Sequence, residues 1–300
     1  MSRQAGSAAA LAPGGSDDRL GIGLMVLTTA VFAAQDGLSR HLAGEYNVLM
    51  VVMIRYWFFA LFVVALAVRR SGGVRAAART ARPVLQAARG LLLAGEICVM
   101  VTAFTLLGLV ESHAVFAIYP LLVAALSGPL LGERVGWRRW SAIGAGFAGV
   151  VVILQPTGGV WSWAAAIPFT AALMFALYNP LTRLASRTDT TATSFFWTGT
   201  VGALVTTAVG AWSWEPMTAP DWAMMATLCV SGAAGHWLLI RTYEAAEASV
   251  VQPFAYLQLV FASLIGLAVF GEALRANVVW GGALVIAAGL FTLWRARRAG

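Results

Sequence analysis

The feature that most constrains this chain is a series of apolar runs, each about 20 residues long, that recur from residue 20 almost to the C-terminus. A helix rises 1.5 Å per residue, so about 20 apolar residues cross the roughly 30 Å hydrocarbon core of a bilayer. Composition agrees with this interpretation, because 60% of the 300 residues are hydrophobic and only 11% are charged, against about 25% charged in soluble domains. The chain is therefore predicted to be a multi-pass protein of the lipid bilayer.

Ten apolar runs qualify as membrane spans, and all are predicted to be helical because backbone groups in lipid must be satisfied within the segment. They lie at residues 20–39, 48–68, 90–110, 113–131, 138–154, 162–182, 194–212, 221–241, 248–270 and 277–294. The fold class is thus all-α integral membrane. Residues 1–19, rich in Ser, Gly and Ala, are predicted to form a disordered tail, and residues 296–300 a short C-terminal tail.

The arginines predict the orientation. With the N-terminus inside, 17 of the 20 basic residues fall in inside segments, two (Arg40 and Arg275) fall outside, and Arg55 lies within the second span. Cytoplasmic segments carry the excess of basic residues. Both termini are therefore expected in the cytoplasm.

Several function classes are disfavoured. The net charge is +7, but the basic residues lie between apolar spans rather than on a soluble basic module. No nucleic-acid partner is therefore expected. Cys98 and Cys229 both lie in apolar runs and form neither a disulfide framework nor a metal motif. No phosphate-binding loop is visible either, so no cofactor and no ATP-driven pumping are expected. The sequence does not indicate an oligomeric state.

The two halves of the chain resemble each other. Gly132-Glu133 recurs as Gly271-Glu272, 139 residues later, and Asp36 aligns with Asn179 at an offset of 143. Residues 20–156 and 157–295 would each hold five helices, and an odd number makes the second copy enter the membrane from the opposite side. Two inverted five-helix repeats are typical of transporters, whose binding site lies between the repeats near the membrane midplane.

The repeat carries a specific resemblance in Tyr119-Pro120, in residues 131–134 (Leu-Gly-Glu-Arg), in residues 252–258 (Gln-Pro-Phe-Ala-Tyr-Leu-Gln) and in residues 270–272 (Phe-Gly-Glu). These motifs resemble the EamA-type repeat of ten-helix members of the drug/metabolite transporter superfamily. The resemblance implies a secondary transporter of the bacterial inner membrane that moves small amphipathic metabolites by alternating access. It also implies a cavity lined by spans 1, 3, 4, 6, 8 and 9. The chain is similar to bacterial exporters of amino acids, including aromatic ones. Drugs or nucleotide-like metabolites are the alternative substrates.

Two rivals of another class remain. An intramembrane enzyme could use Ser231 and His236, although residues five apart on one helix do not face each other. A channel is the second rival, and currents too large for a carrier cycle would support it.

Prolines at corresponding places in the two halves point to the substrate site. Aromatic and amide side chains nearby suit an amphipathic organic solute, although each could instead bond across helices. The candidate substrate-binding residues are Phe116, Tyr119, Trp163, Asn179, His236, Trp237, Tyr256 and Gln258.

Three ionisable residues inside spans are candidates for coupling or gating, because such groups are costly in a membrane. Glu96 could carry a proton or meet a substrate amine, or could form a structural hydrogen bond. Asp36 and Arg55 lie at similar depth in adjacent spans, so an ion pair between them is favoured over substrate contact. Protons are thus a candidate coupling partner. Glu133 and Glu272, at helix ends, are expected to cap the next helix.

Overall fold

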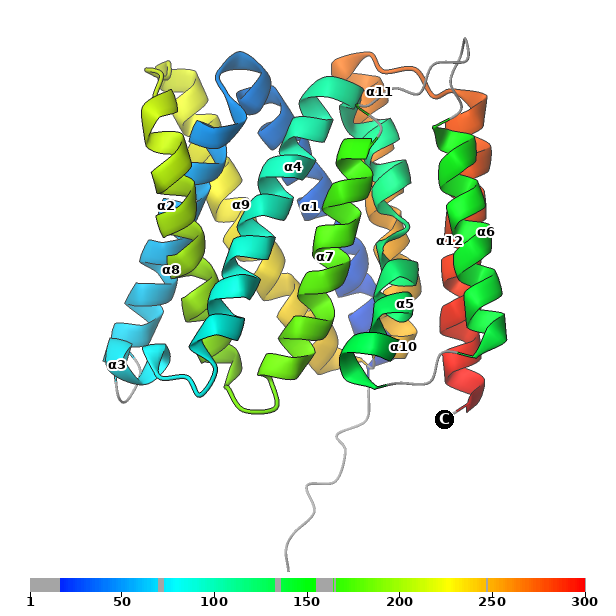
Figure 1. Ribbon diagram of the computed structural model, residues 1–300. Helices are drawn as coiled ribbons and strands as arrows, with labels where there is room; N and C mark the ends of the chain where they lie inside the picture. Colours follow the sequence, from blue (N-terminus) through cyan, green and yellow to red (C-terminus); the bar gives the residue numbers. More distant parts are fainter. Residues whose placement is uncertain are drawn as a thin grey trace, which may run out of the picture.

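The computed structural model describes residues 17–69, 73–132, 136–154, 164, 166–246 and 248–299. Across these residues the regular structure is entirely helical and contains no strand (Figure 1). The predicted all-α class is therefore confirmed. Most of the predicted N-terminal tail, Glu133 and Trp163 lie outside the described residues.

The helices follow the predicted spans closely. The first half contains α1 (Asp18–Glu45), α2 (Val48–Arg69), α3 (Gly73–Ala78), α4 (Pro83–Phe116), α5 (Tyr119–Leu131) and α6 (Trp137–Ile153). The second half contains α7 (Ala166–Ala185), α8 (Thr191–Gly210), η2 (Ala211–Ser213), α9 (Ala219–Ala245), α10 (Ala248–Val251), η3 (Gln252–Tyr256), α11 (Leu257–Phe270) and α12 (Ala276–Ala299).

Seven helical segments in the described part of the chain are long and apolar enough to cross a membrane. They are α1, α2, α4, α8 with η2, the first part of α9, η3 with α11, and α12. Two further apolar helices, α5 and most of α6, are shorter. The chain is therefore a multi-pass membrane protein.

Gly108 divides α4 into two helical segments, with a backbone φ of +85°. Residues other than glycine rarely adopt this left-handed conformation, and here the chain turns back toward α5 (Figure 1). The sequence placed this boundary between residues 110 and 113. The turn comes slightly earlier because the glycine, rather than the end of the apolar run, determines it.

Helices of the two halves pack against one another in pairs. α1 packs on α9, α2 on α8, α4 on α7, and α6 on α12. In the last pair, Gly149 and Gly281 allow very close approach, because a Cβ on Gly149 would lie only 2.7 Å from the Gly281 carbonyl oxygen. Small residues at contacts of this kind are how helices associate in membranes, where lipid provides no hydrophobic driving force.

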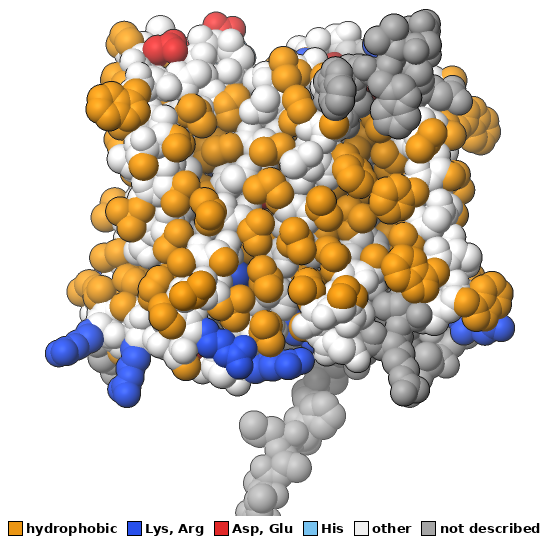
Figure 2. Space-filling model, viewed as in Figure 1, with side chains coloured by type: hydrophobic (Ala, Val, Ile, Leu, Met, Phe, Trp, Pro, Cys, Tyr) orange, Lys and Arg blue, Asp and Glu red, His pale blue; other side chains and the backbone are white. Residues whose placement is uncertain are grey.

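The two ends of the bundle differ in charge. Figure 2 shows arginine side chains along the lower edge and acidic side chains along the upper edge. The lower edge, here called the arginine-rich end, carries exposed Arg69, Arg75, Arg79, Arg82, Arg183 and Arg187. In Figure 1, α1 begins and α12 ends at this same end, so the chain crosses the bundle an even number of times.

We predict that the arginine-rich end faces the cytoplasm, following the excess of basic residues on that side. On a background with Cys98 and Cys229 replaced, a cysteine at Ala276, exposed at the opposite end, should react with an impermeant reagent in intact cells. A cysteine at Ala76, exposed on α3, should react only after the membrane is opened. The reverse labelling pattern would contradict the orientation.

Candidate functional site

A cavity of about 1420 Å³ runs from the arginine-rich end into the bundle. Its walls come from α2, α8 and α9, with contributions from α1 and α4, and α3 lies at its mouth. The α7–α8 connection lies beside α3 at this mouth. The cavity is large enough for a metabolite of several hundred daltons, since typical ligand pockets measure about 300–1,000 Å³.

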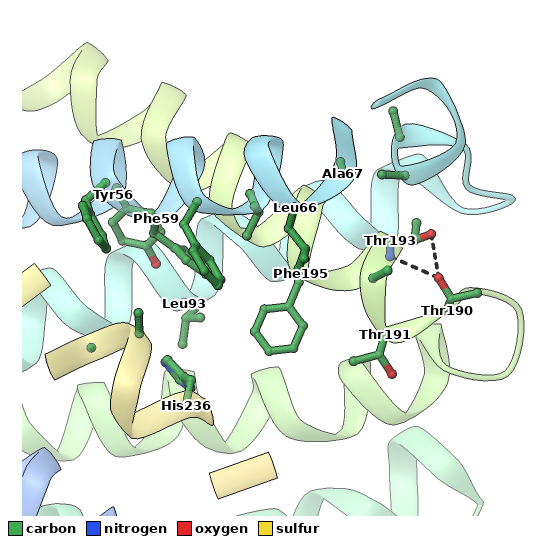
Figure 3. A pocket seen from close by; sticks show the side chains of 18 of the residues that line it. Tyr56, Phe59, Leu66, Ala67, Leu93, Thr190, Thr191, Thr193, Phe195 and His236 are labelled. Atoms are coloured by element: carbon green, nitrogen blue, oxygen red, sulfur yellow. Dashed lines mark hydrogen bonds between the residues drawn. The ribbon is translucent and has the colours of Figure 1, made fainter. Parts of the chain in front are cut away.

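Aromatic rings surround His236 in the cavity. The Phe59 ring stacks near the imidazole with centroids 6.5 Å apart, and Phe195 meets it edge-on at 6.4 Å. Phe32 makes a third contact at 5.6 Å. Figure 3 shows Phe195 extending from α8 into the pocket, beside Phe59 on α2 and His236 on α9. Phe32 contacts His236 but does not line the cavity, whereas Phe59, Phe195 and His236 do. We call these three residues the aromatic cage, and its ring faces suit a flat, apolar-faced solute.

Polar groups lie at the deep end of the cavity. Gln35, Arg55 and Tyr56 all contribute to its lining. The Gln35 Oε1 atom and the Tyr56 hydroxyl are buried without a hydrogen-bond partner among the described residues. Arg55 donates to the Ser39 hydroxyl at 3.2 Å. Because unpaired polar atoms inside a protein are costly, this region is suited to receive a polar edge of a bound solute.

At the mouth, Asp189 holds the α3–α4 connection against the loop before α8. Its carboxylate accepts hydrogen bonds from the Thr80 hydroxyl at 2.5 Å, the Gln86 amide at 2.7 Å and the Ala81 N–H at 3.4 Å. Burial alone would raise the pKa of Asp189, but these hydrogen bonds and the nearby Arg82 lower that pKa below its usual value. The carboxylate therefore stays charged and holds the mouth together throughout the neutral range.

Arg89 is fully buried near the mouth, although the sequence counted it among the loop arginines. It donates to the Thr182 hydroxyl at 3.0 Å and to Gln86 Oε1, and it lies against the Tyr178 ring. The helix starts at Pro83 rather than at residue 90, which draws Arg89 into the bundle. Its charge supports packing between α4 and α7 instead of contact with lipid headgroups.

Asp36 joins three helices. Its Oδ2 atom lies 3.0 Å from His113 Nε2 on α4 and accepts from Gln258 Nε2 on α11 at 3.0 Å. The sequence favoured an ion pair between Asp36 and Arg55, and this was wrong. Arg55 bonds Ser39 instead, while His113 and Gln258 both bond the Asp36 Oδ2 atom.

Glu96 is buried on α4, with 6% of its surface exposed. It lies within electrostatic range of Asp36 and Arg55. The structure thus brings together the three predicted ionisable residues, Asp36, Arg55 and Glu96, between α1, α2 and α4. Only Arg55 of the three lines the cavity.

Glu272 connects the halves at the end opposite the arginines. Its two carboxylate oxygens accept from the N–H groups of Leu109 and Val110, at 2.8 and 2.9 Å, and pair with Arg40. Glu272 therefore caps a helix of the other half, and the expectation that it caps the next helix was wrong. The cap is placed by the Gly108 turn, which points these N–H groups at the carboxylate.

A second ion pair at this end joins Arg275 to Glu111 at 3.0 Å. Arg40 and Arg275 are the two arginines that the sequence placed outside. Each of them pairs with an acidic residue of the opposite half. Within the described residues the cavity reaches the arginine-rich end, and these pairs join the halves at the other.

Of the predicted substrate-binding residues, His236 and Trp237 line the cavity. Phe116 and Tyr119 pack together with Phe175, at centroid distances of 5.2 to 5.7 Å from Phe116. They form a separate aromatic cluster that does not line the cavity.

The remaining predicted residues bond or pack elsewhere. Asn179 donates to its own helix at the Phe175 carbonyl, 2.7 Å away. The Tyr256 hydroxyl is buried near Gly289 without a hydrogen-bond partner among the described residues. Gln258 bonds Asp36. None of these three lines the cavity of this conformation.

Sequence reasoning missed Gln35, Tyr56, Phe59 and Phe195. The run Arg55-Tyr56-Trp57-Phe58-Phe59 carries the available signal, since four aromatic residues follow an intramembrane charge. Nothing in the sequence distinguishes Phe195 from its neighbour Phe196, because which ring points inward depends on how α8 packs on α2.

Comparisons with known proteins agree with this architecture. The model of a family described as the EamA-like transporter family matches residues 19–155 and again residues 161–294. The S-adenosylmethionine uptake transporter of Rickettsia bellii is 23% identical over 280 residues, covering 93% of this chain and 95% of the relative. The riboflavin transporter of Rhizobium johnstonii is 31% identical over 223 residues, covering 73% of this chain and 72% of the relative.

One solved structure, described only as the crystal structure of a protein, matches with a TM-score of 0.60 and 19% identity. The match covers 94% of this chain and 98% of the other. It shows a shared fold and carries no information on substrate.

We predict that Glu272→Ala destabilises the protein far more than Arg275→Ala. The first change leaves the largely buried Arg40 and two helix N–H groups without their partner, which costs about 3 kcal/mol or more. Arg275 is 60% exposed, and exposed pairs contribute about 0–1 kcal/mol. Thermal unfolding of both variants in one detergent measures the difference, and equal small shifts would contradict it.

We also predict that Asp189→Ala exposes the α3–α4 connection to trypsin, which can cut there after Arg79. In the native protein the pKa of Asp189 lies below its usual value of about 3.9. The hydrogen bonds between Asp189 and the α3–α4 connection are therefore kept at neutral pH, and they weaken only as the pH falls through that lowered pKa. Asp18→Ala, at the same end, is the control. Equal cleavage rates of the two variants at neutral pH would show that Asp189 does not hold the connection.

Proposed function

The chain belongs to the EamA-like transporter family, and from this premise we propose that it carries a flat nitrogen heterocycle with a polar tail across the membrane. Family and relatives are transporters, so the protein is a transporter rather than an enzyme. The observation that carries the proposal is the cavity, which combines an aromatic cage with unpaired polar atoms at its deep end.

The cage suits the ring system. Phe59, Phe195 and His236 present ring faces and edges at centroid distances of 6.2 to 6.5 Å from one another. Heteroaromatic rings stack on such side chains whatever their substituents, because every one has a π-face. The hydrogen-bonding edge of the ring would then reach Gln35 and Tyr56.

The relatives support this substrate class. S-adenosylmethionine and riboflavin, the compounds in their names, differ in charge and size. Both nevertheless combine a nitrogen heterocycle with a hydroxyl-bearing sugar or sugar-like chain. That shared chemistry corresponds to the nucleotide-like alternative that the sequence left open.

An aromatic amino acid is the second candidate. Arg55 at the deep end could hold its carboxylate while the cage takes its ring. The cavity of about 1420 Å³ is much larger than such a substrate needs, which places it second. The family resemblance in the sequence led us to expect export. The Rickettsia relatives are named for uptake, and for that reason we propose uptake.

We further propose that the helices form ten spans in two inverted repeats, in a bacterial inner membrane with cytoplasmic termini. The pairing of α1, α2, α4 and α6 with helices of the other half supports this arrangement. Alternating access would then follow as the contacts between halves open at one end and close at the other.

The test is transport into proteoliposomes of labelled S-adenosylmethionine, riboflavin and aromatic amino acids, each alone and in competition. We expect saturable transport of a heterocyclic probe that unlabelled heterocycles inhibit. Transport of amino acids alone would make the second candidate correct. Ion currents without saturable transport would overturn the carrier proposal.

We predict that Phe195→Ala weakens binding of a transported heterocycle by about tenfold, because loss of one stacking contact costs about 1–3 kcal/mol. Phe147→Ala is the matched control, since Phe147 lies on α6, away from the cavity, and is 39% exposed. Competition by unlabelled probe measures both affinities. If Phe195→Ala lowers the affinity for the probe less than Phe147→Ala does, the aromatic cage is not part of the substrate site.

A further inference from the structure

The hydrogen bonds of His113 constrain how many protons it holds. Its Nδ1 atom lies 3.0 Å from the Leu109 carbonyl oxygen, and its Nε2 atom lies 3.0 Å from Asp36 Oδ2. A carbonyl oxygen can only accept, so Nδ1 must carry a proton. Neutral imidazole then has a lone pair at Nε2, which would face a carboxylate oxygen.

From this arrangement we propose that His113 and Asp36 together form a binding site for one exchangeable proton. The proton lies between Nε2 and Oδ2, whichever of the two atoms formally holds it. Its loss to water leaves a lone pair against a carboxylate, and the contact between α1 and α4 becomes repulsive. The pair is mostly enclosed, with 5% and 15% of the two side chains exposed, so water cannot easily replace the lost bond.

Several polar and charged groups lie around the pair, and most of them have partners of their own. Gln258 on α11 donates to Asp36 Oδ2 but brings no charge. Arg55 on α2 and Glu96 on α4 interact electrostatically in this region. Arg40 on α1 and Glu111 on α4 are already paired with Glu272 and Arg275. His236 and Cys229 on α9 lie near Arg55, toward the cavity.

The site is connected to both ends of the transport pathway. Leu109 accepts from His113 at its carbonyl and donates its N–H to Glu272, so the proton pair and the contact between halves share one residue. On the other side, Ser39 lies one turn from Asp36 on α1 and binds Arg55, which lines the cavity. Proton release would therefore loosen the end opposite the cavity mouth, where the halves are joined.

Proton binding itself can be tested without a substrate. The chain has only three histidines, so replacing His41 and His236 by Gln leaves His113 as the single source of ¹⁵N-histidine signals. We expect Nδ1 to carry a proton at every pH measured, and Nε2 to report a second, exchangeable proton that it shares with Asp36 Oδ2. With Asp36→Asn added, Nε2 should stay unprotonated throughout. An Nε2 shift that is the same at every pH, both with the native Asp36 and with Asp36→Asn, would overturn the proposal.

The coupling role rests on the proposed transport function and needs a transport assay. With one proton per solute, a gradient of one pH unit drives accumulation of a transported probe up to about tenfold. Asp36→Asn should reduce this ratio to one while exchange of probe across the membrane continues. His41→Gln, which removes a histidine partly exposed beside Asp221, is the matched control and should keep the gradient response.

The outcomes are distinguishable. If Asp36→Asn still accumulates the probe fully, the coupling group lies elsewhere and the proposed role is overturned. The same holds if Glu96→Gln loses accumulation while Asp36→Asn retains it. If the native protein moves none of the probes, the proposed function fails, and the ¹⁵N measurement still decides whether the proton site exists.

Discussion

The Glu272 carboxylate is the interaction on which the arrangement of the two halves most depends. It receives the first N–H groups after the Gly108 turn and the Arg40 guanidinium. A helix start inside a membrane protein leaves N–H groups that lipid cannot satisfy. Because their acceptor comes from the other half, the turn in the first half is complete only when the second half is in place.

This dependence explains why, in the part of the chain that the structure describes, the cavity reaches the arginine-rich end and not the other. Close contacts between halves at the end of Glu272 leave little freedom there. Toward the arginine-rich end, the cavity lies between the packed pair α2 and α8 on one side and α9 on the other. The mouth is held instead by side chains on connections, such as Asp189 with Thr80. Such contacts can break without unpairing the backbone of a helix, so motion costs less at this end.

The spans could be predicted from the sequence because the length of an apolar run is a local property. The position of α2, for example, agrees with its predicted span within one residue. The cavity could not be predicted, because it depends on which face each helix presents to distant neighbours. Tyr119 and Gln258 align in the repeat, yet one packs among aromatic rings and the other binds Asp36. Likewise, similar depth suggested pairing of Asp36 with Arg55, whereas His113 on a third helix lies closer.

The polar groups of the bundle are divided between two regions with different chemistry. Gln35 and Tyr56, at the cavity, are buried with unpaired atoms, while Asp36, His113 and Gln258, behind it, bond one another. Groups that must accept different solutes benefit from being unpaired in their absence. Groups that hold helices together must be paired, and in a low-dielectric interior the pairing is sensitive to a single proton. Ser39 and Arg55 connect the two regions through the hydrogen bond between them. A solute that draws Arg55 toward itself would weaken this bond, which lies one helical turn from Asp36, and would thereby change the stability of the contacts between the halves.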